Sequence, residues 1–428
     1  MSFEKFKLDE KILAGVNAAG YKKPTPIQAQ SIPSIMEGRD MMGLAQTGTG
    51  KTAAFVLPIL QRLMQGRRGP IRALVIAPTR ELSEQTHEAI MQLGQKTGLC
   101  STTIYGGVSI NNQINRLRSR VDIISACPGR LLDHIGRGTL DLSSVEVLVL
   151  DEADHMFDMG FLPDVRRIVK HLPAKRQTLL FSATMPGEIR SLADDLLCDP
   201  VHIQIGDTAP VMTVAHTFYP VQTEQKTALL KDILEKTDTR SVLVFTRTKS
   251  RAKSLAEQLN RIGHKVTSLH GNLTQQKRKQ SLDGFRDGRY EVMIATDIAA
   301  RGIDVTRISH VINYDMPATA DAYTHRIGRT GRAMKTGDAF TFLTGQDGDL
   351  LRSLKKMLGE KLQYQSVEGL TVSPSVCELT GTRPTPLAKP HNGRKLFPSR
   401  TPSSRRSGQR SLKDAGGMSW SHRAPQAA

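Results

Sequence analysis

The chain has 428 residues, of which 39% are hydrophobic, and a formal net charge of +18. A chain of this length exceeds one ordinary core, so we expect two domains and a further segment. The excess of positive charge favours nucleic acid as a partner over an anionic membrane surface, because the sequence has no basic amphipathic helix.

The cysteines and the apolar segments exclude several classes of protein. Cys100, Cys127, Cys198 and Cys377 have no paired spacing, which excludes a zinc finger of the usual pattern and argues against a disulfide framework. The first residues lack the apolar core of a signal peptide, and no run of about 18 apolar residues occurs. We therefore expect a soluble, cytosolic protein.

Two helices are predicted in the first forty residues. Leu8 and Ile12 recur at helical spacing, and Gly20 can end the first helix. Pro26 begins the second, and Gln28 lies on its first turn. The amide of Gln28 can both donate and accept hydrogen bonds, which matches the edge of adenine. Without other motifs, a Gln at this place is an ordinary surface residue.

A glycine-rich loop, Ala45-Gln-Thr-Gly-Thr-Gly-Lys-Thr52, follows a short strand and precedes a helix. Backbone N–H groups in such a loop cradle phosphates. Lys51 is expected to reach the terminal phosphates, and the hydroxyl of Thr52 to ligate magnesium. The general pattern has Gly where this chain has Ala45, so the match is incomplete.

Strands and helices then alternate as far as residue 150, and each strand ends in a loop of small or basic residues. The strands are expected at residues 73–77, 101–105 and 121–125. Thr79, Arg80 and Arg130 follow strand ends, where they could contact phosphates. Each is an ordinary turn or cap residue by itself, but their recurrence is typical of a parallel doubly wound sheet.

The apolar run Val145–Leu150 predicts a strand buried on both faces, and it ends in Asp151 and Glu152. One carboxylate can hold a divalent metal while its neighbour handles a proton. Two adjacent acids usually lie in a solvated loop. Here the upstream phosphate loop, with its own metal-binding hydroxyl, favours a nucleotide site instead.

A further strand is expected at residues 177–181, and it ends in Ser182-Ala-Thr184. These hydroxyls could bond Asp151 or Asp154 and couple the acids to the rest of the domain. In the absence of the acids, this tripeptide would be an ordinary turn.

The segment Gly206–Pro210 interrupts the pattern and marks the predicted domain boundary. A second α/β series follows. Its strands are expected at residues 241–245, 265–269, 291–295 and 310–314. No second glycine-lysine phosphate loop occurs in it, so this half is expected to supply residues in trans to the first.

Arg326, Arg329 and Arg332 recur at three-residue intervals after His325. This spacing keeps the three arginines on roughly one side of a helix or turn. Arginine keeps its charge and grips phosphate in a fork, which suits the stabilisation of a transferring phosphoryl group. The ordinary alternative is a solvated basic face or a nucleic-acid patch.

The end of the chain differs in composition. Residues 381–428 contain ten Lys and Arg against one acid, Asp414, so this segment carries +9 of the total +18. It is rich in Pro, Ser and Gly, and we predict a disordered basic tail. Trp420, the single tryptophan of the chain, could stack on a base, although a lone aromatic in a tail is more often incidental.

In their order and separation, these motifs resemble those of the DEAD-box RNA helicases, of the bacterial RhlE-like kind. The motifs that carry the resemblance are Gln28, Ala45–Thr52, Pro78–Leu82, Gly106-Gly107, Pro128–Arg130, Asp151–Asp154, Ser182–Thr184, Ala295–Asp304 and His325–Arg332. The resemblance implies an α/β fold with two RecA-like doubly wound parallel-sheet domains in tandem. They would span residues 1–208 and 209–365, followed by the disordered basic tail at 366–428.

The resemblance also implies ATP and Mg²⁺ as cofactors, and a set of catalytic residues. Glu152 would position and deprotonate the attacking water, and Asp151 would hold the metal. Arg329 and Arg332 would act as arginine fingers, and His325 would bond across the closed cleft. The implied catalytic set is Lys51, Asp151, Glu152, His325, Arg329 and Arg332.

A nucleotide pocket is implied in the same way. Phe3 would stack on adenine, and Tyr21 and Thr25 would shape the pocket around it. The implied nucleotide-binding residues are Phe3, Tyr21, Thr25, Gln28, Thr47, Gly48, Thr49, Gly50, Lys51, Thr52, Gly302 and Asp304, with Thr52 and Asp151 on the metal.

The family binds RNA across both domains through phosphates and 2′-hydroxyls, with little base specificity. The implied contacts are Thr79, Arg80, Gly107, Arg130, Gln275, Arg278 and Thr296. The expected partners are single-stranded and short duplex RNA, together with ribosomal or RNA-degradation proteins. We expect no membrane partner and a monomeric core.

Three positions depart from the family pattern. Cys127 stands where the family usually has Thr, Met334 replaces a usual Gly, and Thr246-Arg247 is not the commonest pair. None touches the ATP chemistry, so we expect activity.

Two alternatives remain open. One is an ATP-gated RNA clamp or annealer, which the basic tail suggests. The other is a DNA translocase with a related core, against which the Asp151–Asp154 signature argues.

Overall fold

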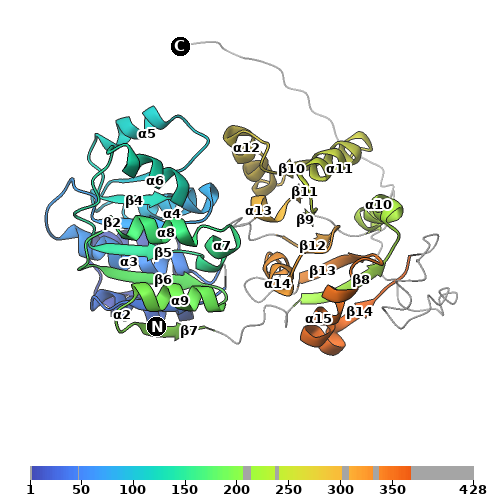
Figure 1. The fold of residues 1–428 in the computed structure, drawn as a ribbon, viewed down its shortest axis with the longest axis horizontal. Coiled ribbons are helices and arrows are strands. Elements are labelled where there is room, and N and C mark those ends of the chain that lie inside the picture. Colours follow the sequence, from blue (N-terminus) through green and yellow to red (C-terminus); the bar gives the residue numbers. More distant parts are fainter. Residues whose placement is uncertain are drawn as a thin grey trace, which may run out of the picture. The chain divides into compact units, whose positions relative to one another are not determined.

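The computed structural model describes residues 2–46, 48–205, 214–236, 241–300, 308–330 and 337–367. These residues form two seven-stranded sheets (Figure 1). The first sheet contains β1 (Met41–Leu44), β2 (Ala73–Ile76), β3 (Ser101–Ile104), β4 (Ile123–Ala126), β5 (Val147–Leu150), β6 (Gln177–Ser182) and β7 (Val201–Gln204). The second contains β8 (Val214–Pro220), β9 (Val242–Phe245), β10 (Val266–Leu269), β11 (Val292–Ala295), β12 (His310–Asn313), β13 (Gly337–Leu343) and β14 (Leu362–Tyr364).

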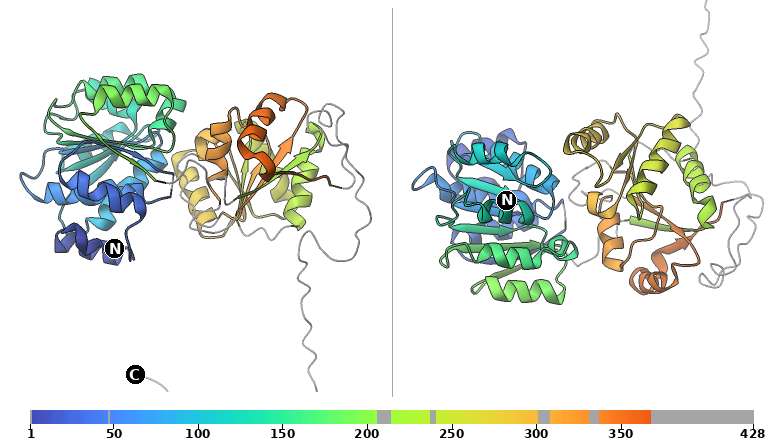
Figure 2. Two further views of the ribbon diagram at one scale, coloured as in Figure 1. Left: turned by 90° about the horizontal axis from the view of Figure 1, so that it is seen from below. Right: turned by 45° about the horizontal axis from the view of Figure 1, so that its top comes forward.

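Both sheets have the same topology. The first has the order β3-β4-β2-β5-β6-β1-β7, and the second has the order β10-β11-β9-β12-β13-β8-β14. Counted from its own first strand, β8, the second sheet repeats the order of the first. All pairs of neighbouring strands are parallel. Parallel neighbours need crossover connections, and helices cover both faces of each sheet (Figure 2). The predicted α/β class with two doubly wound sheets is confirmed.

Helices supply these crossovers, and the helices before residue 41 precede the first strand. Those of the first half are η1 (Phe3–Phe6), α1 (Glu10–Ala18), α2 (Pro26–Met36), α3 (Lys51–Met64), α4 (Arg80–Leu93), α5 (Ile110–Leu117), α6 (Pro128–Gly136), α7 (Ala153–Asp158), α8 (Leu162–Val169) and α9 (Gly187–Leu196). Those of the second half are η3 (Thr223–Gln225), α10 (Lys226–Lys236), α11 (Lys249–Arg261), α12 (Gln275–Arg286), α13 (Asp297–Ala300), α14 (Ala320–Ile327), α15 (Gly348–Leu358) and η4 (Gly359–Lys361). None of the described helices is long and apolar enough to cross a bilayer.

Strand β5 separates the two cores of the first half. Val147 and Val149 pack into the core on one face of the sheet, and Leu148 and Leu150 pack into the core on the other. All four side chains are buried. The prediction of a strand buried on both faces is therefore correct, and the chain that leaves β5 is held from both sides.

Four strands were not predicted: β7, β8, β13 and β14. The apolar pattern of β8 and β13 is interrupted by polar residues that have hydrogen-bond partners inside the fold. His216 Nδ1 lies 3.0 Å from the hydroxyl of Tyr323, and Asn313 on β12 donates to Thr341 at 3.1 Å. Since buried polar groups are tolerated when they are hydrogen-bonded, these strands do not have the apolar run that marks β5.

The predicted boundary at residues 208 and 209 and the predicted tail beyond residue 367 lie outside the described residues. The same holds for Trp420 and Met334.

Candidate active site and nucleic-acid interface

The phosphate loop connects β1 to α3. Gly48 and Gly50 have φ values of 84° and 94°, a region that glycine adopts readily. The backbone carbonyl of Gly50 accepts a hydrogen bond from Gln28 Nε2 at 3.0 Å, and a Cβ on Gly50 would lie 2.5 Å from the same nitrogen. Lys51 is buried, and its ammonium donates to the carbonyl of Ala45 at 2.9 Å. Thr47 lies outside the described residues.

Gln28 is not a surface residue, because its side chain is 3% exposed. Its Oε1 accepts from the backbone N–H of Thr25 at 3.0 Å, so it caps α2 while its Nε2 supports the phosphate loop. Two other residues of the implied adenine pocket lie close together, with the ring centroids of Phe3 and Tyr21 6.3 Å apart. The structure thus brings Gln28 to the phosphate loop and Phe3 to Tyr21.

Asp151 directly follows β5, and its carboxylate is almost entirely buried. Burial raises the pKa of this carboxyl to about 7, although the Lys51 ammonium opposes the shift. Its Oδ1 is buried and has no hydrogen-bond partner in the described part of the chain. A buried, unpaired carboxylate oxygen is costly unless a cation is bound, so the residue fits a metal ligand.

The described residues contain no group of three His, Cys, Asp or Glu side chains that could hold a metal alone. Magnesium usually keeps several waters and shares phosphate oxygens, so one carboxylate and one hydroxyl suffice on the protein side. Thr52, on the first turn of α3, supplies that hydroxyl. Asp151 and Thr52 therefore fit a magnesium ion that is also bound to phosphate.

Glu152 has a strained backbone. Its φ is 54°, in the left-handed region, which costs about 1–3 kcal/mol for a residue with a side chain and is common at functional sites. Its Oε2 lies 2.6 Å from His155 Nδ1. Burial alone would raise the pKa of the Glu152 carboxyl, but His155, Lys51 and Arg329 outweigh burial and lower it to about 2. Glu152 is therefore ionised and held in one orientation.

Asp154 forms hydrogen bonds with the Ser182–Thr184 segment. Its Oδ2 accepts from the backbone N–H groups of Ala183 and Thr184 at 3.1 and 3.0 Å and from the Thr184 hydroxyl at 3.2 Å. The predicted hydrogen bonding of this segment to one of the acids is confirmed, and the partner is Asp154. His325 Nε2 lies 3.6 Å from the same carboxylate, beyond hydrogen-bond length. The ring of His325 meets His155 edge-on, with centroids 4.8 Å apart.

Arg326 has a structural role that was not predicted from the sequence. It is buried and pairs with both carboxylate oxygens of Asp297, at 2.5 and 2.7 Å. The same guanidinium donates to Asn313 Oδ1 at 3.1 Å and to the carbonyl of Asp315 at 2.6 Å. It therefore ties α14 to the ends of β11 and β12. The alternative of a solvated basic face is wrong for Arg326 and for Arg329, which is 4% exposed.

Part of the implied set lies outside the described residues: Gly302, Asp304 and Arg332.

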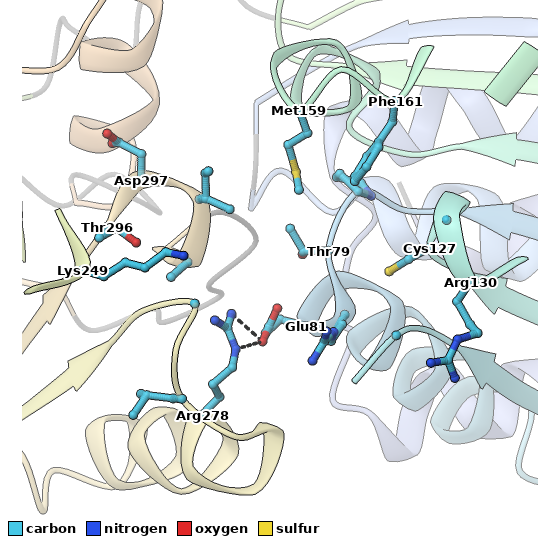
Figure 3. Close-up of a pocket in the computed structure, with 18 of the residues that line it drawn as sticks. Thr79, Glu81, Cys127, Arg130, Met159, Phe161, Lys249, Arg278, Thr296 and Asp297 are labelled. Atoms are coloured by element: carbon cyan, nitrogen blue, oxygen red, sulfur yellow. Dashed lines mark hydrogen bonds and ion pairs between the residues drawn. The ribbon is translucent and has the colours of Figure 1, made fainter. Parts of the chain in front are cut away.

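A cavity of about 730 Å³ gathers the implied RNA contacts (Figure 3). Five of the seven line it: Thr79, Arg80, Arg130, Arg278 and Thr296. The other two lie against Arg80, whose Nη1 donates to Gln275 Oε1 at 3.2 Å and would be 2.2 Å from a Cβ on Gly107. Sequence analysis missed further lining residues, among them Met159, Phe161, Arg247 and Lys249. Only the basic character of the last two could have indicated them.

Arg278 is paired within the protein. Its Nε and Nη2 both lie 2.7 Å from Glu81 Oε1, and both side chains are buried (Figure 3). Glu81 lies in the Pro78–Leu82 motif, but it was not among the implied RNA contacts. The pair joins α4 to α12, so Arg278 contributes to the shape of the cavity as well as to its charge.

Cys127 lines the same cavity at the beginning of α6. Burial raises the pKa of its thiol to about 12, with the Glu81 carboxylate acting in the same direction. The thiol therefore stays protonated and is not a reactive thiolate at neutral pH.

Comparisons with known proteins assign these motifs to a protein family. Residues 25–192 match the DEAD/DEAH box helicase model, and residues 225–334 match the helicase conserved C-terminal domain model. The DEAD-box ATP-dependent RNA helicase CshA of Bacillus subtilis is 43% identical over 365 residues, which cover 85% of this chain and 73% of that protein. The chain belongs to the DEAD-box helicase family. CshA of Listeria monocytogenes is 43% identical over 362 residues, covering 84% of this chain and 69% of that protein.

Solved structures agree with this DEAD-box assignment. S. cerevisiae Dbp5 bound to RNA and ADP BeF3 superposes with a TM-score of 0.78 at 32% identity, covering 86% of this chain and 96% of that one. The two parallel sheets are accordingly the tandem RecA-like domains of a DEAD-box protein, as predicted. The RhlE-like subtype stays a prediction.

Proposed function

We propose that this DEAD-box protein is an RNA-stimulated ATPase that separates short RNA duplexes. The observation that carries the proposal is the contact between the two halves at the acids that follow β5. His325 Nε2, from α14, lies 3.6 Å from the Asp154 carboxylate, and its ring meets that of His155 with centroids 4.8 Å apart. His155 in turn lies 2.6 Å from Glu152, so the second sheet reaches the acids beside the phosphate loop, which suits a nucleotide bound between the two halves.

The nucleotide would be held mainly by the N-terminal half. Backbone N–H groups of the glycine-rich loop and the Lys51 ammonium would bind phosphates. Phe3, Tyr21, Thr25 and Gln28 would form the adenine pocket. The proposed nucleotide-binding set is completed by Thr47, Gly48, Thr49, Gly50, Thr52, Gly302 and Asp304.

Thr52 and Asp151 would hold Mg²⁺. When bound, this ion supplies neutralisation of the negative charge on the phosphates. The unpaired Oδ1 of Asp151 supports this assignment.

Glu152 would orient the attacking water and accept its proton. Its lowered pKa keeps Glu152 ionised, as the acceptor of a proton must be. Arg329 and Arg332 would stabilise the charge on the transferring oxygens. His325, beside Asp154 and His155, would link the two halves of the site.

RNA would bind in the cavity between Thr79, Arg80, Gly107 and Arg130 on one side and Gln275, Arg278 and Thr296 on the other. Such contacts go to phosphates and 2′-hydroxyls, so the preferred partners would be single-stranded and short duplex RNA of any sequence. We also propose domains at residues 1–208 and 209–365 with a basic tail at 366–428. We further propose a cytoplasmic location, a monomeric core and partners in ribosome assembly or RNA degradation.

The test is strand separation by the full chain. We expect a short RNA duplex with a single-stranded overhang to be separated only when ATP is present, as followed by native gel electrophoresis. Single-stranded RNA should stimulate ATP turnover, and DNA of the same sequence should not. Equal stimulation by DNA would favour the DNA translocase instead.

A further inference from the structure

Helix α5 packs against the first sheet through apolar residues and one polar residue. Of its eight residues, Gln113 is the one fully buried side chain, at 4% exposed, while Ile110, Ile114 and Leu117 are half-buried. These three residues lie at helical spacing and form the usual apolar stripe of a surface helix. The most deeply buried side chain is nevertheless a glutamine, so hydrogen bonds as well as apolar packing fix the position of α5.

Gln113 uses both ends of its amide. Its Nε2 donates to the carbonyl of Tyr105 at 3.0 Å. Its Oε1 accepts from Arg130 Nη1 and lies within 3.1 Å of His134 Nε2. Arg130 Nη1 also donates to the carbonyl of Val108 at 3.1 Å. One side chain therefore joins the loop that carries Gly106 and Gly107 to the first two turns of α6.

His134 completes the network. It is fully buried, and its Nδ1 lies 2.7 Å from the hydroxyl of Thr139. Burial and then the charge of Arg130 lower the pKa of its imidazole, so the ring is neutral at pH 7. The neutral ring with hydrogen on Nε2 donates to Gln113, and its Nδ1 is then an acceptor for the Thr139 hydroxyl. The one hydrogen of that hydroxyl is shared between Nδ1 at 2.7 Å and the backbone carbonyl of His134 at 3.1 Å.

Neither Gln113 nor His134 lines the cavity of the implied RNA contacts, whereas Gly106 and Arg130 do. Any effect of the two buried residues on a strand in that cavity must pass through their neighbours. Because a buried polar group that loses its partner is costly, the loop and the arginine are expected to move together or not at all.

We propose that Gln113 and His134 are positioning residues that hold the Gly106–Val108 loop and Arg130 at a fixed separation for an RNA strand. This inference rests on the proposed function, since it assumes that the loop and Arg130 contact RNA. It adds two buried residues that determine RNA affinity without touching RNA.

The test compares RNA-stimulated ATP turnover of the full chain carrying Gln113→Leu with that of Asn112→Leu, an exposed change on the same helix. In Gln113→Leu the KM for single-stranded RNA should rise about tenfold, while kcat stays within about twofold. Gln113→Glu keeps the acceptor for Arg130 and His134 but loses the donor to the Tyr105 carbonyl, so its KM should lie between those of wild type and Gln113→Leu. A merely structural residue would lower the melting temperature without this separation of KM from kcat.

If Gln113→Leu does not fold, Thr139→Val takes its place, because it removes only the hydroxyl that orients His134. Its KM for RNA should rise about threefold. An unchanged KM in the folded variant, or an equal rise in Asn112→Leu, overturns the positioning claim alone. A wild-type chain that RNA does not stimulate overturns the proposed function, and the positioning claim with it.

Discussion

Replacing Glu152 by Gln should lower RNA-stimulated ATP turnover by about 10²- to 10⁴-fold, the range for loss of a general base. Gln has nearly the shape of Glu, so it can occupy the strained position with φ of 54° and still reach His155. ATP affinity should stay within about twofold of wild type, because the phosphates would be bound by Lys51 and the loop. Steady-state turnover and fluorescent-nucleotide titration measure the two quantities.

Glu188→Gln is the matched control. Glu188 is an exposed residue on α9, and the same chemical change there should leave turnover unaltered. Turnover by Glu152→Gln within about twofold of wild type would remove Glu152 from the role of general base.

Replacing Arg326 by Ala should lower the free energy of unfolding of the second half by about 3 kcal/mol. The change leaves Asp297 without its bidentate partner and removes donors from Asn313 and from the carbonyl of Asp315. The figure is at the low end for a broken buried pair, because the Asp297 side chain is 32% exposed and water can compensate in part. Urea denaturation followed by circular dichroism measures the loss.

Arg352→Ala tests whether any lost arginine ion pair would do the same. Arg352 and Asp349 form an exposed pair on α15, so their loss should cost no more than a surface pair usually contributes. Arg326→Lys should recover little, since a single ammonium cannot reproduce the fork. Equal destabilisation by the changes at residues 326 and 352 would contradict the importance given to burial.

The features that sequence predicted well are those set by neighbouring residues. The run Val145–Leu150 and the acids after it form a local pattern, and β5 with Asp151 and Glu152 followed from it. The phosphate loop and the start of α2 at Pro26 are local in the same sense. A pattern of this kind needs no knowledge of distant partners.

What sequence could not predict depends on contacts between distant segments. Arg326 and its neighbour Arg329 look alike in sequence, and the buried role of Arg326 follows from Asp297, 29 residues away, at the end of another strand. The burial of Gln113 depends in the same way on Arg130 and His134. Polar residues within β13 likewise gave no apolar run, because their partners lie on neighbouring strands.

We propose that ATP and RNA bind the same arrangement of the two RecA-like domains, so each should strengthen the binding of the other. RNA affinity of Glu152→Gln, measured by fluorescence anisotropy with and without saturating ATP, tests this most directly because the nucleotide stays intact. We expect ATP to lower the Kd for single-stranded RNA by about 5- to 150-fold. An identical Kd in both conditions would contradict the account.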